Sequence, residues 1–238
     1  MASNHIAQGL RLLKSPNVNR LFVAYLVTYT GTAMAPIAMA FGVLELTGSA
    51  ADAAFVIAAP TAAAIVVLLF GGVIADRTSR QKVIVLAEFT AMAAQSTIAW
   101  LFLSGNATLT LLTLGMLING MAMALHAPAA MGMITQLVPK AELQSTNAIL
   151  GIARNSAFAG GAALGGVLVA TLGAGFTLLI VGLSFGLSAL LILSLRPVAQ
   201  EKTEPQSVLQ DLRLGWQEFT RHTWLWAIVL QFLSLIHI

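Results

Sequence analysis

Charged residues and cysteines are what this 238-residue chain has least of. Only 9% of its residues are charged and none is cysteine, whereas 58% are hydrophobic. A soluble domain of this length cannot bury so much apolar surface, so the composition argues against a soluble enzyme or binding domain. The lack of cysteine excludes disulfides and thiolate metal sites. We therefore predict a protein that is embedded in the lipid bilayer.

Four long stretches contain no charged residue at all, namely 21–44, 53–75, 89–139 and 155–195. A helix needs about 20 mostly apolar residues to cross a bilayer, so the two longer stretches have room for two helices each. They divide at Ser104–Asn106 and at Gly173–Gly175, where small, turn-forming residues can reverse the chain. Continuous apolar runs favour helices over barrel strands, which alternate in polarity. We predict six transmembrane helices, at roughly 21–46, 53–75, 83–103, 108–134, 145–171 and 176–195.

Sequence motifs of the common enzyme classes are also missing. The chain contains no H-E-x-x-H, no G-x-x-x-x-G-K-(S/T) phosphate loop and no G-x-S-x-G elbow. We therefore expect no enzymatic activity, no cofactor and no metal. Without a phosphate loop the chain cannot itself hydrolyse ATP, so any transport would draw on an ion gradient.

The positive charges have a one-sided distribution. With the N-terminus inside, all but one of the 12 lysines and arginines fall in inner segments, and the three short outer turns carry none. The exception is Arg154, within the fifth helix. The net charge of +3 therefore reflects the orientation of the chain in the membrane, and we expect no nucleic-acid partner. The prediction is a multi-pass protein of a bacterial-type inner (cell) membrane with a cytoplasmic N-terminus.

These patterns divide the chain into four parts. Residues 1–20 form a cytoplasmic N-terminal segment and residues 21–195 the six-helix bundle. Residues 196–222 contain two prolines and charges of both signs, which is typical of a cytoplasmic linker. Residues 223–238 begin another apolar run that is too short for a full span, so we expect the start of a truncated seventh helix.

The loop between the second and third helices concentrates charge between two apolar runs. Gly72, Asp76, Arg77, Arg80 and Lys82 resemble the G-x-x-x-D-R-x-G-R-(R/K) signature of the major facilitator superfamily. Ser79 replaces the second glycine, and Gln81 takes the next basic position. Glycine allows close helix approach, aspartate can cap a helix, and basic residues meet anionic headgroups. The alternative is a charge cluster that only sets the topology.

This resemblance implies the N-terminal six-helix bundle of a major facilitator fold. In that family the loop works as a conformational gate that latches two six-helix bundles together. A C-terminal six-helix bundle of the same chain is therefore the expected partner, and it is missing from these 238 residues.

A second resemblance lies in the fifth helix. Residues 161–166 are similar to the G-P-x-x-G-G exporter motif of the superfamily, with Ala162 in place of proline. Gly161, Gly165 and Gly166 would form a helix-packing motif, because glycines remove side chains from one helix face. Ordinary small-residue packing is the alternative. Together with Pro128, Pro139 and Asn147, the pattern resembles the enterobactin exporter and macrolide efflux branch.

The resemblance implies a secondary active transporter. We expect proton-coupled export of small hydrophobic or amphipathic compounds, of the drug or siderophore type, with the bilayer, the small-molecule substrate and protons as partners. Two alternatives stay open. One is metabolite uptake by the same fold, and the other is a membrane receptor or scaffold that transports nothing.

The first and fourth helices have similar centres. Residues 31–36 and 120–128 both begin with glycine and end with proline, which predicts broken helices near the membrane midplane. A cavity there would be lined from both helices, and adaptable methionine and aromatic side chains suit varied hydrophobic cargo. The alternative is plain packing or lipid contact. The candidates are Tyr25, Tyr29, Thr32, Met34, Asn119 and Met123.

Three ionisable residues lie within predicted spans. Glu88, His126 and Arg154 all fall in the cytoplasmic half, and such groups usually face an interior or water. We predict a coupling group, with Glu88 as acid, His126 as titrating base and Arg154 as counter-charge. The alternative is that Glu88 and Arg154 snorkel to the interface while His126 stays neutral. Glu45, at the outer end of the first helix, is either solvated or a site of proton uptake.

Overall fold

The computed structural model describes residues 11–77 and 79–196, together with single positions between 216 and 231. For residues 68–77 it describes the backbone only. The side chains of Gly72, Asp76 and Arg77, three of the five predicted gate residues, therefore lie outside the described part.

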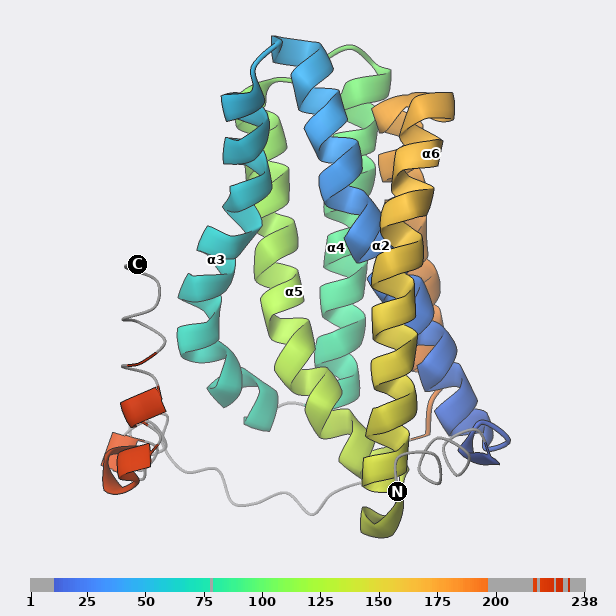
Figure 1. The fold of residues 1–238 in the computed structure, drawn as a ribbon, viewed down its shortest axis with the longest axis vertical. Coiled ribbons are helices and arrows are strands. Elements are labelled where there is room, and N and C mark those ends of the chain that lie inside the picture. Colours follow the sequence, from blue (N-terminus) through green and yellow to red (C-terminus); the bar gives the residue numbers. More distant parts are fainter. Residues whose placement is uncertain are drawn as a thin grey trace. The chain divides into compact units, whose positions relative to one another are not determined.

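The described chain is built from long helices (Figure 1). They are α2 (Pro16–Thr47), α3 (Ala50–Arg77), α4 (Arg80–Leu103), α5 (Leu109–Leu137), the short 3₁₀ helix η1 (Lys140–Glu142) and α6 (Leu143–Leu193). The described residues contain no strand. Five helical segments are long and apolar enough to cross a membrane. The prediction of an all-α membrane protein is thus confirmed.

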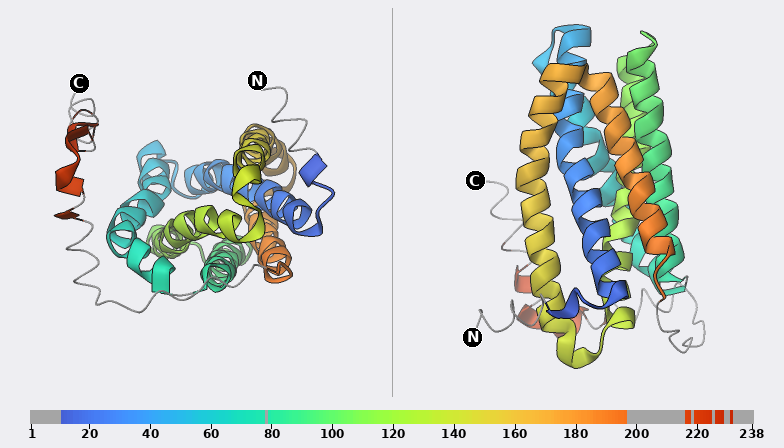
Figure 2. Two further views of the ribbon diagram at one scale, coloured as in Figure 1. Left: turned by 90° about the horizontal axis from the view of Figure 1, so that it is seen from below. Right: turned by 90° about the vertical axis from the view of Figure 1, so that its right-hand side faces the viewer.

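The last helix, α6, differs from the expectation in one respect. It contains 51 residues, roughly 75 Å of helix, which exceeds the roughly 30 Å hydrocarbon core. Gly173 departs from helical geometry (φ 80°, ψ 171°), and Figure 2 shows two antiparallel arms that meet in a turn at one end. The predicted helices at 145–171 and 176–195 correspond to these arms. The predicted count of six separate helices is not confirmed, because the chain reverses at one residue without a loop.

Three reversals of the chain lie at the same end of the bundle, at the top of Figure 1. Each contains a glycine with positive φ: Gly48 (68°), Gly105 (72°) and Gly173 (80°). Only glycine adopts this backbone conformation at no steric cost, so the turns depend on it. The opposite end holds the α3–α4 junction, η1 and the end of α6. Those are the segments in which the sequence concentrates lysine and arginine.

Four helices start earlier than predicted, namely α2, α3, α4 and α6. The first helix begins at Pro16, and proline is favoured there because the first-turn N–H groups have no partner within the helix. The third begins at Arg80. The prediction used charge to mark boundaries, but arginine and lysine stems extend along a helix while their charges reach the headgroups.

Close helix contacts in the bundle depend on glycine. A Cβ atom added to Gly120 of α5 would overlap the backbone of Pro60 in α3, and one added to Gly31 would overlap the Ser184 hydroxyl. The predicted broken centres are wrong: α2 and α5 continue as helices through Pro36 and Pro128. Each proline removes only one N–H donor, so the helix continues past it. The glycines allow the helices to approach closely and do not interrupt them.

The inner end of α6 is held by side chains from two other helices. The Gln81 amide of α4 donates to the carbonyl oxygens of Ile192 (2.8 Å), Leu193 (3.2 Å) and Leu195 (3.0 Å). The Arg20 guanidinium of α2 donates to the Ser194 carbonyl at 2.9 Å. A helix leaves its last carbonyls unpaired, so these contacts complete its end. Gln81, a departure from the family signature, therefore has a structural partner.

Residues 200–238 form a second unit. Its described positions between 216 and 231 are mostly helical, and the rings of Trp216 and Phe219 lie 5.8 Å apart. Most of the predicted linker (196–222) and of the predicted seventh helix (223–238) lies outside the described residues.

Candidate functional site

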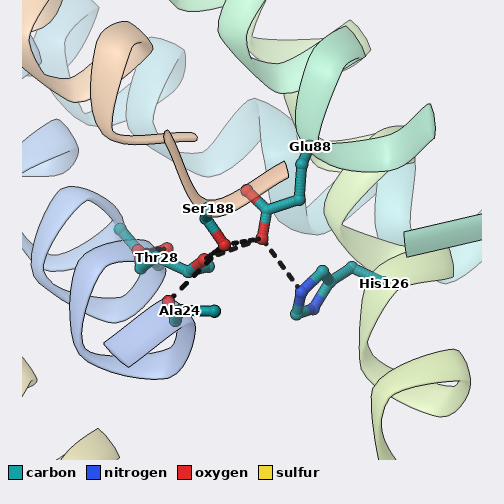
Figure 3. A network of polar contacts seen from close by, with 6 residues as sticks. Ala24, Thr28, Glu88, His126 and Ser188 are labelled. Carbon is teal, nitrogen blue, oxygen red and sulfur yellow. Dashed lines mark hydrogen bonds and ion pairs between the residues drawn. The ribbon is translucent and has the colours of Figure 1, made fainter. Parts of the chain in front are cut away.

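Four helices bring polar side chains to one buried point in the bundle. Thr28 comes from α2, Glu88 from α4, His126 from α5 and Ser188 from the second arm of α6 (Figure 3). We call these four residues the Glu88 cluster. The flanking positions of α4 include alanines with almost no exposed surface, so the neighbouring helices approach closely and the polar atoms meet.

The carboxylate of Glu88 is the centre of the cluster. Its Oε1 accepts hydrogen bonds from Thr28 Oγ1 (2.7 Å) and Ser188 Oγ (3.1 Å), and His126 Nε2 lies 3.1 Å away. Glu88 has no exposed surface and His126 is 5% exposed. A carboxylate at such a depth is costly unless it is paired and hydrogen-bonded. Here two hydroxyls and an imidazole supply those partners.

Thr28 and Ser188 have fewer hydroxyl protons than they have possible hydrogen bonds. Thr28 Oγ1 also lies 2.6 Å from Ser188 Oγ, which in turn lies 3.5 Å from the Ala24 carbonyl. Two hydroxyls own one proton each, so they cannot fill all four contacts at once. A proton on Glu88 would add a donor where one is lacking. Glu88 Oε2 has no hydrogen-bond partner among the described residues.

Arg154 stands apart from the Glu88 cluster. It lies exposed on the first arm of α6, close enough to Tyr29 for its charge to act on the phenol. Tyr29 packs between Tyr25 and Phe158, with ring centroids 5.4 and 5.6 Å apart, and is close enough to Glu88 to interact with its charge. Of the three predicted coupling residues, the structure thus brings two into contact. The third is linked to them through a tyrosine.

The other predicted cavity residues are spread over the bundle. Thr32 Oγ1 donates to the Thr28 carbonyl at 2.8 Å, so it faces its own helix. Met34 is 3% exposed and packs against Gly165. Met123 packs against the same apolar cluster as Met34. Asn119 carries a buried Oδ1 without a hydrogen-bond partner among the described residues. Tyr25 and Tyr29 are in ring contact with each other, and Arg154 lies close enough to Tyr29 for its charge to act on it.

The predicted packing glycines divide into two kinds. A Cβ atom on Gly161 would lie 2.7 Å from the Thr30 carbonyl oxygen, and one on Gly165 would lie 3.1 Å from Met34 Cα, so both face α2. A Cβ atom on Gly166 would meet nothing within 4 Å. Gly166 therefore borders open space, while its two neighbours in the motif form the α2–α6 contact.

Two of the predicted gate residues have described side chains. Arg80 donates to the Gly132 carbonyl near the inner end of α5 and lies 3.4 Å from Thr135 Oγ1. Lys82 borders a groove of about 360 Å³ between α4 and α5. The start of α4 is thus tied to α5 by a charged hydrogen bond. Among the described residues, no three or more His, Asp or Glu side chains are grouped so as to hold a metal ion.

The sequence did not single out Thr28 or Ser188. A hydroxyl within a transmembrane helix usually bonds to a carbonyl of its own helix, as Ser184 does with Val181. Helical spacing places Thr177, Ser184 and Ser188 on neighbouring faces, but it does not say which hydroxyl finds a partner on another helix. Only the packing of α6 against α2 and α4 decides that.

Comparison with known proteins gives one family. Residues 21–237 match the Major Facilitator Superfamily. The chain is 29% identical over 213 residues to "Multidrug efflux pump Tap" of Mycobacterium tuberculosis (strain ATCC 25618 / H37Rv), and equally to the protein of that name in Mycobacterium bovis (strain BCG / Pasteur 1173P2). These alignments cover 86% of this chain and 50% of each relative. The chain thus spans about half the length of the curated relatives it matches.

Proposed function

Because the chain belongs to the major facilitator superfamily, we propose that it forms the N-terminal bundle of a proton-coupled exporter of small hydrophobic or amphipathic compounds. The observation that carries this proposal is the buried Glu88 cluster, which joins four helices through one carboxylate. The relative named as a multidrug efflux pump supports drugs over siderophores as cargo. A second six-helix bundle completes the transporter.

The Glu88 cluster couples a proton to the packing of the bundle. With Glu88 ionised, Thr28 and Ser188 donate to its Oε1, and a protonated His126 pairs with it. When Glu88 takes up a proton, the carboxyl group donates to one of the hydroxyls and its attraction to His126 falls. The contacts that hold the four helices together therefore differ between ionised and protonated Glu88. Glu88 lies roughly 12 Å from the inner end of α4, so it releases this proton towards the cytoplasm. The release restores the first arrangement.

The substrate surface lies beside this cluster, on α2 and the first arm of α6. Tyr29 and Phe158 offer partly exposed aromatic faces, with Tyr25 buried against Tyr29, and Arg154 adds one positive charge near Tyr29. Aromatic faces accept varied apolar molecules. Tyr29 interacts with both Arg154 and Glu88, so a compound bound there would be sensitive to the protonation of the cluster.

The α3–α4 junction, which contains Asp76 and Arg77, acts as the inner gate in this proposal. Arg80 anchors the start of α4 to the Gly132 carbonyl of α5, which gives the loop a fixed base. Asp76 and Arg77 then meet the second bundle when the inner face closes. The concentration of lysine and arginine at this end supports a cytoplasmic N-terminus in a bacterial-type inner membrane.

Transport direction tests the proposal against its alternatives. Inverted membrane vesicles carrying a full-length transporter with this chain as its first half are given an inward-acid pH gradient and a fluorescent lipophilic dye. An exporter accumulates the dye inside the vesicles and stops when an ionophore collapses the gradient. Dye movement out of the vesicles would support uptake instead. No gradient-dependent movement of dye or metabolites would support a receptor or scaffold.

A further inference from the structure

The groove of about 360 Å³ between α4 and α5 is the second hollow on the surface of the bundle that carries a charge at its edge. Leu86 and Ala87 line it from α4, and Ile118, Met121 and Ala122 line it from α5. Leu86, Ile118 and Met121 are 68%, 43% and 41% exposed, whereas the two alanines are buried. Small residues thus form the floor of the groove, and large exposed side chains form its walls.

The groove begins at the inner end of α4 and has the depth of one leaflet. Its lining on α4 extends from Lys82, the third residue of the helix, to Thr90, roughly 12 Å further along. One leaflet contributes about 15 Å to the hydrocarbon core, half of its thickness of roughly 30 Å. The groove therefore covers most of the inner leaflet and follows the direction of a lipid acyl chain.

Lys82 adds one positive charge at the inner end of this groove. Its two neighbours turn elsewhere, since Arg80 donates to the Gly132 carbonyl of α5 and Gln81 donates to the last carbonyls of α6. Lys82 has no hydrogen bond or ion pair among the described residues, and none of those that line the groove is a carboxylate. A lysine stem can lie on apolar surface while its ammonium group stays at the headgroups.

The charge borders the groove because of a departure from the family signature. The signature has a basic residue where this chain has Gln81, and the lysine follows one position later. One residue turns a helix by about 100°, because a turn contains 3.6 residues. The shift moves the positive charge away from the end of α6 and onto the face shared by α4 and α5. This placement of Lys82 therefore follows from the sequence of this chain and not from the signature.

We propose that the groove binds one anionic phospholipid of the inner leaflet, with its phosphate beside Lys82 and one acyl chain against Leu86 and Met121. The phosphate supplies the counter-charge that Lys82 lacks among the described residues, as basic pockets between helices do for anionic headgroups. The acyl chain gives the floor and walls of the groove the contacts that they otherwise lack. The proposal does not depend on the direction or the coupling of transport.

Native mass spectrometry of the 238-residue chain in a neutral detergent counts the lipids that stay bound. The probes are dioleoyl phosphatidylglycerol and dioleoyl phosphatidylcholine, which share acyl chains and differ in net charge. The chain should bind phosphatidylglycerol about fivefold more tightly, the preference expected from one lysine near an anionic headgroup. Lys82→Gln should abolish this preference. Lys140→Gln, at an exposed lysine of the same end that does not line the groove, is the matched control and should keep it.

A second pair of variants tests the apolar part of the site. Met121→Trp places a larger side chain in the wall of the groove and should weaken phosphatidylglycerol binding, because less room is left for the acyl chain. Leu114→Trp is the control, since Leu114 is exposed on the same helix and does not line the groove. Dihexanoyl phosphatidylglycerol, which has the same headgroup on short chains, should bind much more weakly than the dioleoyl lipid. All variants should keep the helical circular dichroism of the parent chain.

Several results would overturn the proposal. Equal binding of the two dioleoyl lipids, or equal losses in Lys82→Gln and Lys140→Gln, would show that Lys82 selects no headgroup. Unchanged binding in Met121→Trp would place the lipid elsewhere, and equal binding of the dihexanoyl lipid would make a phosphate group alone the ligand. A chain that forms dimers and retains no lipid would make a second copy the occupant. If a full-length transporter retains no phosphatidylglycerol where this chain does, the second bundle is the occupant.

Discussion

The contact between α2 and the first arm of α6 predicts opposite results for two neighbouring glycines. In Gly161→Ala the new Cβ would lie 2.7 Å from the Thr30 carbonyl oxygen and 3.0 Å from Thr30 Cα. Both are backbone atoms, so the helices must move apart. In Gly160→Ala the new Cβ meets nothing within 4 Å. We therefore expect the first variant to be destabilised and the second to be unaffected or stabilised.

The magnitude follows from two terms. Replacing glycine by alanine within a helix gains about 1 kcal/mol of helix propensity, and this gain is common to both positions. Overpacking a filled contact costs about 1–3 kcal/mol, and only Gly161→Ala incurs it. The difference in unfolding free energy between the two variants should therefore be about 1–3 kcal/mol, with Gly161→Ala the less stable.

Reversible unfolding of the chain in mixed micelles, titrated with a denaturing detergent and followed by tryptophan fluorescence, measures this difference. Because the two variants are neighbours on one helix, the helix-propensity gain, whose scale was measured in water, cancels in their difference. Equal unfolding free energies for Gly160→Ala and Gly161→Ala would refute the argument that Gly161 is required for the α2–α6 contact.

Two further predictions concern side-chain amides of α4. Gln81→Leu removes the amide whose two N–H donors serve three of the last carbonyls of α6. It should lower the unfolding free energy by about 1–3 kcal/mol and speed amide hydrogen exchange near Ile192, and an unchanged exchange rate would contradict the capping role. Gln95→Met replaces a fully buried amide whose Oε1 has no partner among the described residues and whose Nε2 reaches only Met116 Sδ at 3.9 Å. It should leave the unfolding free energy unchanged or raise it by about 1 kcal/mol, and a loss in the same unfolding titration would indicate an unseen partner such as water.

Sequence reasoning located the helices and their reversals well. Length and apolarity alone define a span, and Gly105 and Gly173 mark turns because only glycine adopts their backbone geometry readily. It was wrong about broken centres in α2 and α5. A glycine that permits close contact and a glycine that ends a helix look the same in a sequence, and the neighbour that distinguishes them, Pro60 for Gly120, lies on another helix.

The candidate site was predictable only in part. Glu88 and His126 were conspicuous because ionisable residues are rare at membrane depth, and the structure places them 3.1 Å apart. Thr28 and Ser188 gave no signal, since hydroxyls commonly bond within their own helix. Arg154 was expected beside Glu88, but it is exposed on α6 and lies near Tyr29. Partners across helices depend on rotation and register, which spacing along one chain does not determine.

Proton coupling through Glu88 is the central claim, and separating exchange from accumulation tests it most directly. Proteoliposomes carrying the full-length transporter are assayed for substrate exchange at equilibrium and for accumulation driven by a pH gradient. Glu88→Gln keeps the shape of the side chain and an acceptor for Thr28 and Ser188 but cannot lose a proton. It should retain exchange and lose pH-driven accumulation, while the control Glu142→Gln, on the η1 segment outside the Glu88 cluster, retains both. Undiminished pH-driven accumulation in Glu88→Gln would contradict the account.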